Sequence, residues 1–378
     1  MGTTAGTREE MKKFFTSHWP FLLIIIVWLL FSSPFWLKKL IPFPTRYLVT
    51  AFAQWSTSYA MPVKSASMPD VITQIYPWKR ISIDSWRRGS PPLWNPYSFA
   101  GSLHAGNYQT AVFSPMNILF YFFSQPVSWS LLILLQPLFA GFFMYVYLRS
   151  ERLSREASAI GSVAFMFCGF LVVWMAYGTL GYAALVLPLN LFAVNSVRKR
   201  KTWWALPLLS VSTAFSFVSG HFQISIYVLF FTLLFIVTTG DNNTKRKHIY
   251  GQLICLTLGI AIAAPQLWET YHAYSESVRS NSFAIGEVIP WQYLITFFAP
   301  DFYGNPVTRN DWFGHYAEWA GFIGVVPLLL ALVAVKFAIH GKKLFFVTVA
   351  GISLLFALPT PLMELMYRAH IPVLSTSS

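Results

Sequence analysis

The chain has 378 residues, of which 55% are apolar and only 11% are charged. Soluble proteins carry about 25% charged residues, so this composition excludes an ordinary soluble domain and predicts many membrane spans. The net charge of +13 does not indicate nucleic-acid binding, because the basic residues are spread over short segments between apolar runs. Cys168 and Cys255 both lie in apolar runs, which predicts two buried, inert thiols and no disulfide framework.

Nine apolar runs are predicted to form membrane-spanning helices. The first extends from Trp19 to Leu37 and follows a polar tail, residues 1–18. The others cover residues 127–148, 157–176, 180–197, 202–218, 222–239, 249–268, 317–339 and 344–358. The expected fold is an all-α polytopic membrane protein with about nine transmembrane helices and a large ordered outer loop after the first.

Basic residues indicate the orientation of these spans, because short cytoplasmic loops are enriched in Lys and Arg. The basic clusters of the tail and of four short loops all fall on one side: Arg8, Lys12 and Lys13; Arg149, Arg152 and Arg155; Arg198 to Lys201; Lys245 to Lys247; Lys336, Lys342 and Lys343. We therefore expect a multi-pass protein of the cytoplasmic membrane with its N-terminus inside.

This topology divides one transmembrane domain, residues 1–378, into consecutive parts. A first outer loop, 41–126, with interfacial helices precedes a helix bundle, 127–268, and a second outer loop, 269–316. The last spans and an outer tail occupy 317–378, and the ending without a closing element predicts a longer natural protein. Every sizeable polar segment faces outward, so an active site is expected at the outer leaflet.

The first outer loop contains the densest local signals. Asp70, followed by Val71, Ile75 and Trp78, predicts the start of an amphipathic helix. Asp70 either caps that helix or acts as a general base on the outer face. The helix carries basic residues that are expected at the level of the lipid headgroups: Lys79, Arg80, Arg87 and Arg88.

Turn residues and amides follow in the same loop. Trp94-Asn95-Pro96 and Gly101 predict tight turns, so Asn95 either forms a turn or orients a substrate hydroxyl. Gln74 and Gln109 are either packing amides or, beside aromatic rings, sugar-binding groups. The short apolar run Met116–Phe123 predicts a helix that is too short to span and lies along the interface.

Metal ligands are sparse. The outer histidines have no partner at ligand spacing, so a zinc site is not expected: His104, His221, His272, His315 and His370. The outer acidic residues are candidates for a hard cation or are simply solvated: Glu269, Glu276, Glu287, Asp301, Asp311 and Glu318. Glu318 is expected to open a span, as an interfacial carboxylate or as part of a site. The sequence contains no Asp-x-Asp pair, P-loop or dinucleotide fingerprint.

Several segments, taken together and in order, resemble the YfhO-like bacterial membrane proteins over nearly the whole chain. In the first outer loop these are Asp70 to Pro77, Gly89 to Gly101 and Gln109 to Pro115. Downstream they are Ser219 to Gln223, Ala299 to Gly304 and Glu318 to Ala331. The outer-loop segments carry most of the specificity of the resemblance, since each downstream piece is short.

The resemblance implies a GT-C-type membrane glycosyltransferase. Such an enzyme moves a sugar from a polyprenyl-phosphate donor to an envelope glycan, lipid or protein, and Asp70 is implied as its general base. Weaker candidates for substrate binding share the motifs: Gln74, Trp94, Asn95, Gln109, His221, Gln223 and Glu318. Charge on the leaving phosphate would be offset by Arg279, Arg309, Arg368 or a divalent cation such as Mg²⁺ or Mn²⁺, a choice that the sequence leaves open.

Two other functions fit the same composition. A lipid or polysaccharide flippase or transporter would have many spans, with broken helices and buried charges near the midplane. The predicted spans are nearly free of ionisable residues, which argues against it. A non-catalytic scaffold for envelope assembly would use the first outer loop for docking, and Asp70→Asn would then leave its function intact.

Overall fold

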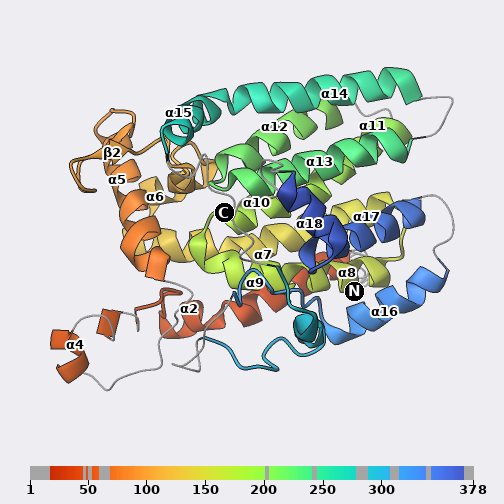
Figure 1. The fold of residues 1–378 in the computed structure, drawn as a ribbon, viewed down its shortest axis with the longest axis horizontal. Helices are drawn as coiled ribbons and strands as arrows, with labels where there is room; N and C mark the ends of the chain where they lie inside the picture. Colours follow the sequence, from red (N-terminus) through yellow and green to blue (C-terminus); the bar gives the residue numbers. More distant parts are fainter. Residues whose placement is uncertain are drawn as a thin grey trace, which may run out of the picture.

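The computed structural model describes residues 18–45, 48–49, 53–58, 69–200, 204–240, 245–277, 288–306, 315–337 and 342–369. This part of the chain is mostly helical, with one two-stranded antiparallel sheet. The long helices lie roughly side by side in a bundle, and the segment with α5, α6 and β2 lies at one end of it (Figure 1). All sequence regions that were expected to be apolar spans contain helices.

The helices of the bundle are continuous in some places and broken in others. The bounds are His18–Phe31, α2 Ser33–Lys38, α7 Gln125–Ser150, α8 Arg155–Met166, α9 Gly169–Trp174, η4 Met175–Tyr177, α10 Leu180–Leu185, α11 Leu187–Arg200, α12 Ala205–Val218, α13 Phe222–Thr238, α14 Lys245–Ile262, α15 Ala264–Ser275, α16 Val325–Lys336, α17 Lys342–Ala357 and α18 Pro361–Arg368. The most extensive packing joins α12 to α14, α7 to α8, and α11 to both α7 and α12.

Two helices, Gln125–Ser150 and Leu180–Arg198, are long and apolar enough to cross a membrane. The number rises to five if each of three bent helix pairs is one span, with bends of 43°, 62° and 69°. Four shorter apolar helices of 10–17 residues occupy the remaining expected positions. The part of the chain that the structure describes therefore supports membrane-spanning helices, although helix length alone does not give nine.

Exposed apolar stripes are consistent with contact with lipid. On α14 the side chains of Tyr250, Ile254, Leu258 and Ile262 repeat every four residues and are all more than half exposed. Large exposed apolar patches mark interaction surfaces, and on a helix of this composition the natural partner is the hydrocarbon of a bilayer. The helices α16 and α17 are also exposed to the surroundings, since none of their described residues is buried.

The last predicted spans begin and end differently from the expectation. The run 317–339 was expected to be a span that Glu318 opens, but residues 315–324 are turns and irregular chain, and α16 begins only at Val325. Gly321 shows why: a Cβ atom there would lie 2.0 Å from Phe297 Cε1, so this segment is held close to the 291–297 turn of helix. The run 249–268 is likewise broken, at Ala263.

Between the first helices and α7 lies a compact segment, residues 69–123, called the first loop below. It contains η1 Val71–Ile75, α5 Tyr76–Arg87, β1 Trp94–Asn95, β2 Ser102–Leu103, η2 Tyr108–Thr110, η3 Pro115–Ile118 and α6 Leu119–Phe122. The helix α4 Ala53–Ser58 precedes it. The amphipathic helix and the short helix after Ser114 are both confirmed.

The first loop is fixed to the bundle by an aromatic cluster. The fully buried Trp129 of α7 packs edge-to-face against Tyr76, at 5.1 Å between ring centroids, and against Phe43, at 5.9 Å. Val71, Ile75 and Ile83 face the same core and are at most 1% exposed, which matches their helical spacing. Burial of such aromatic rings contributes most to the docking of one element on another.

Candidate functional site

Asp70 lies in a helical turn whose geometry was not predicted. The residues after it, Val71–Ile75, form a π-helix, a rare conformation that often occurs at functional sites. Asp70 does not cap the helix through its side chain; its Oδ1 instead accepts a hydrogen bond of 3.0 Å from Gln74 Nε2. The capping alternative is therefore wrong, and the half-buried carboxylate is oriented by a neighbouring amide.

The structure brings Asp70 and Glu318 toward one side chain. Burial raises the pKa of Tyr177, the last residue of η4, and the negative charges of Asp70 and Glu318 raise it further. The π-helix that follows Asp70 packs directly on η4. Glu318 also approaches His315, at 4.0 Å between Oε2 and Nδ1. Two predicted site residues that are far apart in the sequence therefore lie within electrostatic range of the same tyrosine.

Trp94 and Asn95 form the hairpin that their turn signals predict. Trp94 pairs with Leu103 and Asn95 with Ser102. Asn95 is 4% exposed, and its Oδ1 accepts a hydrogen bond of 2.9 Å from the backbone N–H of Tyr97, so it forms a turn. The Trp94 ring lies over Gly101, where a Cβ atom would be 2.2 Å from Cζ2. Its indole is still half exposed and accessible to a ligand.

Gln109 lies in η2, beside a polar core that the sequence did not reveal. Lys79 was expected among lipid headgroups, but it is 2% exposed and donates to Thr110 O at 3.1 Å and to Asn117 Oδ1 at 2.8 Å. Burial lowers the pKa of Lys79 to about 7. The same burial, together with the Lys79 charge, lowers the pKa of His104 to about 4. Gln109 is half-buried next to this core.

His221 and Gln223 begin α13 rather than joining Asp70. His221 is buried, and its Nδ1 accepts a hydrogen bond of 3.4 Å from the backbone N–H of Ile224, which caps the helix. Gln223 donates to Tyr227 Oη at 2.8 Å, one turn further along the same helix. An edge-to-face ring contact between Tyr108 and Phe222 links this helix start to the first loop.

A cavity of about 250 Å³ lies beside α9, between that helix and two later segments. These segments, residues 288–306 and 315–324, are called the second loop below, and they include the 3-10 helix η6 Trp291–Phe297. The lining is as follows: Phe167, Gly169, Val172, Val173, Tyr293, Thr296, Pro300, Asp301, Tyr303, Gly304, Tyr316, Trp319, Ala320 and Phe322. A hydrogen bond of 2.5 Å from Gly169 N to Phe322 O joins the two walls.

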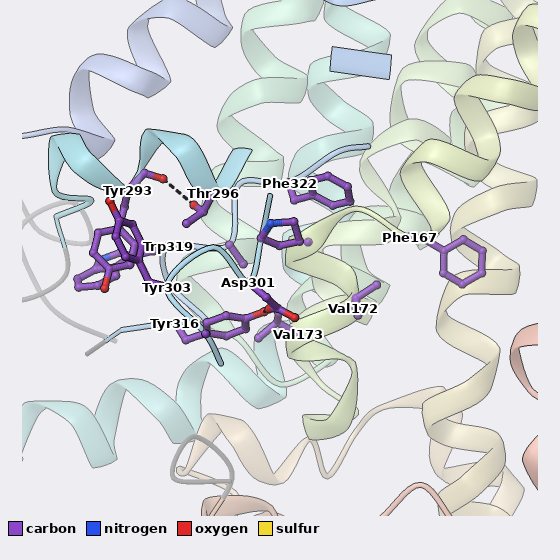
Figure 2. Close-up of a pocket in the computed structure, with 14 residues that line it drawn as sticks. Phe167, Val172, Val173, Tyr293, Thr296, Asp301, Tyr303, Tyr316, Trp319 and Phe322 are labelled. Carbon is purple, nitrogen blue, oxygen red and sulfur yellow. Dashed lines mark hydrogen bonds between the residues drawn. The ribbon is translucent and has the colours of Figure 1, made fainter. Parts of the chain in front are cut away.

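The two walls of the cavity differ in chemistry. In Figure 2, Tyr293, Tyr303 and Trp319 cluster at one side, Phe167 lies at the other, and Asp301 and Tyr316 lie between them. Within the cluster, the ring centroid of Tyr293 is 4.5 Å from that of Trp319 and 4.7 Å from that of Tyr303. One wall is therefore a cluster of Tyr and Trp rings, and the other, from the break between α8 and α9, is apolar and carries no polar side chain.

Asp301 is the acidic group of this cavity. Its Oδ1 accepts a hydrogen bond of 2.5 Å from Tyr316 Oη, and its Oδ2 accepts one of 3.0 Å from Asn305 Nδ2. Burial and the neighbouring carboxylate raise the pKa of Tyr316, so the phenol stays a donor at neutral pH. These two donors fix the carboxylate plane and leave other acceptor positions on both oxygens.

Sequence reasoning placed Asp301 only among possible cation ligands and did not identify Tyr293, Tyr303, Tyr316 or Trp319. The available signal was the aromatic density on both sides of the Ala299 to Gly304 segment. Among the described residues, no group of three or more His, Cys, Asp or Glu side chains could hold a metal ion. The candidates Glu287, Asp311, Arg279, Arg309 and His370 lie outside the described residues.

Comparison of the chain with protein-family models, with curated proteins and with solved structures finds no match.

Proposed function

We propose that the protein is a membrane glycosyltransferase that uses a polyprenyl-phosphate sugar as donor. The observation that carries the proposal is the Asp70 carboxylate, which the Gln74 amide orients at 3.0 Å. Asp70 directly precedes a π-helix that packs on η4, which follows the cavity-lining helix α9. Trp319 of the cavity is the residue after Glu318, and Val173 lies one helical turn before Tyr177. The resemblance of the motifs to YfhO-like proteins supports the same class, with about nine spans in a GT-C-like arrangement.

In the proposed reaction, an envelope glycan, lipid or protein supplies a hydroxyl group as acceptor. Asp70 takes the hydroxyl proton, and the oxygen attacks the anomeric carbon of the donor sugar. The bond between that carbon and the phosphate oxygen breaks, and polyprenyl phosphate leaves with the bonding electrons. The Gln74 amide holds the Asp70 carboxylate in one orientation, which is what a positioned base requires. The isoprenoid chain stays in the bilayer beside the apolar helices.

The test uses the full-length protein in liposomes with a panel of polyprenyl-phosphate sugars, with and without Mg²⁺ or Mn²⁺. Release of polyprenyl phosphate is expected for the wild type and is expected to fall by about 10²- to 10⁴-fold in Asp70→Asn, the range for loss of a general base. Asp84→Asn is the matched control, because Asp84 lies in the same loop and pairs with Arg80 on the surface. Thermal stability should not differ between the two variants.

Two outcomes would contradict this assignment. Equal turnover in Asp70→Asn and wild type would remove Asp70 from the site and leave Glu318 as the candidate base. Absence of turnover with every donor would favour a flippase, a transporter or a scaffold.

One observation favours transport as the second candidate. Transporters build their sites at broken helices, and three helix pairs are bent by more than 40° at short breaks. The residues at these breaks, Phe167 and Cys168, Ala263, and Leu358 to Thr360, include no acidic or basic side chain. A transported ion or charged headgroup would therefore lack a counter-charge at the breaks, and so we rank transport below transfer.

A further inference from the structure

We propose that the cavity between α9 and the second loop binds a single uncharged sugar ring and discriminates against acidic sugars. The inference deepens the proposed function and depends on it only for the role of the bound sugar in the reaction. None of the residues named above as predicted substrate-binding groups lines this cavity.

The size of the cavity fits one ring. Its volume of about 250 Å³ lies just below the range of roughly 300–1,000 Å³ that is typical of sites for drug-sized ligands. A disaccharide or the whole lipid-linked donor would not fit, whereas a single pyranose with its substituents would. The site is therefore suited to one sugar unit, with any lipid or glycan attached to it outside the cavity.

The aromatic wall provides the apolar part of the recognition. A pyranose has one face of C–H groups, which packs on the face of an aromatic ring, while its hydroxyls point outward around the rim. Trp319 and Tyr293 are half-buried and are held by mutual ring contact at 4.5 Å, so little side-chain entropy remains to be lost on binding. Trp319 also makes an edge-to-face contact with His315, at 5.6 Å between ring centroids.

The polar part of the recognition comes from Asp301. A carboxylate has about four acceptor positions, and Tyr316 and Asn305 occupy one on each oxygen. The positions that remain accept hydrogen bonds from two sugar hydroxyls, and charge-assisted bonds of this kind are roughly twice as strong as neutral ones. The same two donors keep the carboxylate plane fixed before the sugar arrives.

The charge of the lining excludes acidic ligands. The lining residues, all of them described, include Asp301 and no Lys or Arg. A uronic acid or a phosphate placed here would meet a like charge with no counter-ion among the lining residues, which is unfavourable at contact distance. The cavity is therefore unsuited to the phosphate of the donor and suited to a neutral sugar ring.

The apolar wall explains why the cavity exists at all. Phe167 and Gly169 flank the break between α8 and α9, where the helix axis bends by 43°. A Cβ atom on Gly169 would lie 3.0 Å from Ala320 O and 3.1 Å from Phe322 O. The absence of a side chain there allows the second loop to approach the break and enclose the space between them.

Ligand binding can be measured without turnover by saturation-transfer NMR on the full chain in lipid nanodiscs. The probes are methyl glucoside, methyl galactoside and methyl N-acetylglucosaminide as neutral sugars, and methyl glucuronide as the acidic one. We expect binding of at least one neutral probe and about five- to tenfold weaker binding of the glucuronide, the effect of one like charge near the surface.

Three variants test the cavity directly. Val173→Phe fills it and is expected to weaken the neutral probe by about tenfold or more, through loss of space for the ring. Asp301→Asn removes the charge, so the ratio of neutral to acidic binding should approach one. Trp291→Ala is the matched control, because Trp291 is an exposed aromatic residue of the same loop that does not line the cavity, and it should bind like the wild type.

Failure of this inference differs from failure of the proposed function. The inference is overturned if no neutral probe binds to the wild type. It is also overturned if Val173→Phe binds the neutral probe as tightly as the wild type and Asp301→Asn keeps the wild-type ratio of neutral to acidic binding. Turnover that persists in Val173→Phe would show that the protein is a transferase whose reaction does not use this cavity. Binding of neutral sugars by a protein without transferase activity would support the sugar site and reject the proposed transferase function.

Discussion

The first and second loops differ in whether their polar side chains are buried or exposed. In the first loop, Lys79 and Asn117 are 2% and 6% exposed and bond to each other and to backbone carbonyls. In the second loop, Asp301 is exposed and faces a cavity with an aromatic wall. The loop with the denser sequence motif therefore uses many of its polar residues to hold its own shape. The second loop, whose sequence motifs are shorter, lines the cavity.

Attachment to the bundle differs as well. The first loop docks through large buried side chains, with Trp129, Tyr76 and Ile83 in one core cluster. The second loop is joined through backbone hydrogen bonds, from Gly169 N to Phe322 O and from Ile289 N to Ala357 O at 2.8 Å. A segment with few buried apolar contacts opens more readily than one with many. We infer that the first loop is the rigid support and the second the adaptable one.

The largest expected effect comes from pH acting on the first loop. The pKa of Lys79 is about 7 in the folded protein, against 10.5 for an unburied lysine. Between pH 7 and pH 10.5 the unfolded chain therefore binds one proton more at Lys79 than the folded protein does. Stability should therefore rise as the pH increases from about 7 to about 10, by up to about 5 kcal/mol, and should not change below about 7 through this group.

Thermal unfolding in nanodiscs across this range measures the slope. Lys79→Met keeps most of the volume, removes the titrating group and should flatten the dependence. A slope that is the same in Lys79→Met and wild type would show that other groups control it, and the contrast between the two loops would then not rest on Lys79.

The next largest effect is a difference in the free energy of unfolding between two Asn→Ala variants, one in each loop. Asn117→Ala removes one of the two acceptors of Lys79 and leaves Thr110 O as the other. It also removes one donor to Ala111 O and one to Val112 O, which keep the Ser114 N–H and the Trp86 Nε1–H as donors. The loss of a hydrogen-bond partner by the buried Lys79 ammonium group is expected to lower the free energy of unfolding by about 1–3 kcal/mol. Asn305→Ala in the second loop removes one donor to the exposed Asp301 and should cost less than about 1 kcal/mol. Unfolding free energies that are equal for both variants would contradict the comparison.

A smaller, local effect is expected in the hairpin of the first loop. In Gly101→Ala the new methyl group would lie 2.2 Å from Trp94 Cζ2, at a residue with φ of +107°. We expect the Trp94 ring to be displaced and the local stability to fall by about 1–3 kcal/mol, measured by hydrogen exchange over residues 94–103. Gly89→Ala is the control, because it shares a positive φ of +74° but meets no atom within 4 Å. Equal protection in the two variants would mean that the Trp94 contact does not matter.

The helices and turns were predictable because they depend on local patterns. The spacing of Val71 and Ile75 correctly indicated a buried helix face, and the Trp94 to Pro96 segment correctly indicated a turn. Composition does not indicate a π-helix after Asp70, because that conformation depends on one extra residue per turn that the packing on η4 accommodates. The position of Lys79 was wrong for a similar reason: a lysine on a helix is solvated unless acceptors elsewhere enclose it.

The candidate site was predicted in part. Asp70 and Glu318 were chosen separately, and both lie within electrostatic range of Tyr177, whereas His221 and Gln223 lie at the start of another helix. The Asp301 pair with Tyr316 joins residues 15 positions apart, a contact that no short motif can encode. Such contacts arise only when a chain folds back on itself.

By itself, the sequence determined the helical class of the chain, its apolar segments and the presence of an ordered loop after the first helix. These properties follow from composition and from hydrophobic periodicity, which act over a few neighbouring residues. Only the tertiary structure decided where the helices break, which polar side chains are buried and where a cavity remains. Those features depend on the close approach of distant segments, such as Gly169 to Phe322, and packing of that kind is a property of the whole fold.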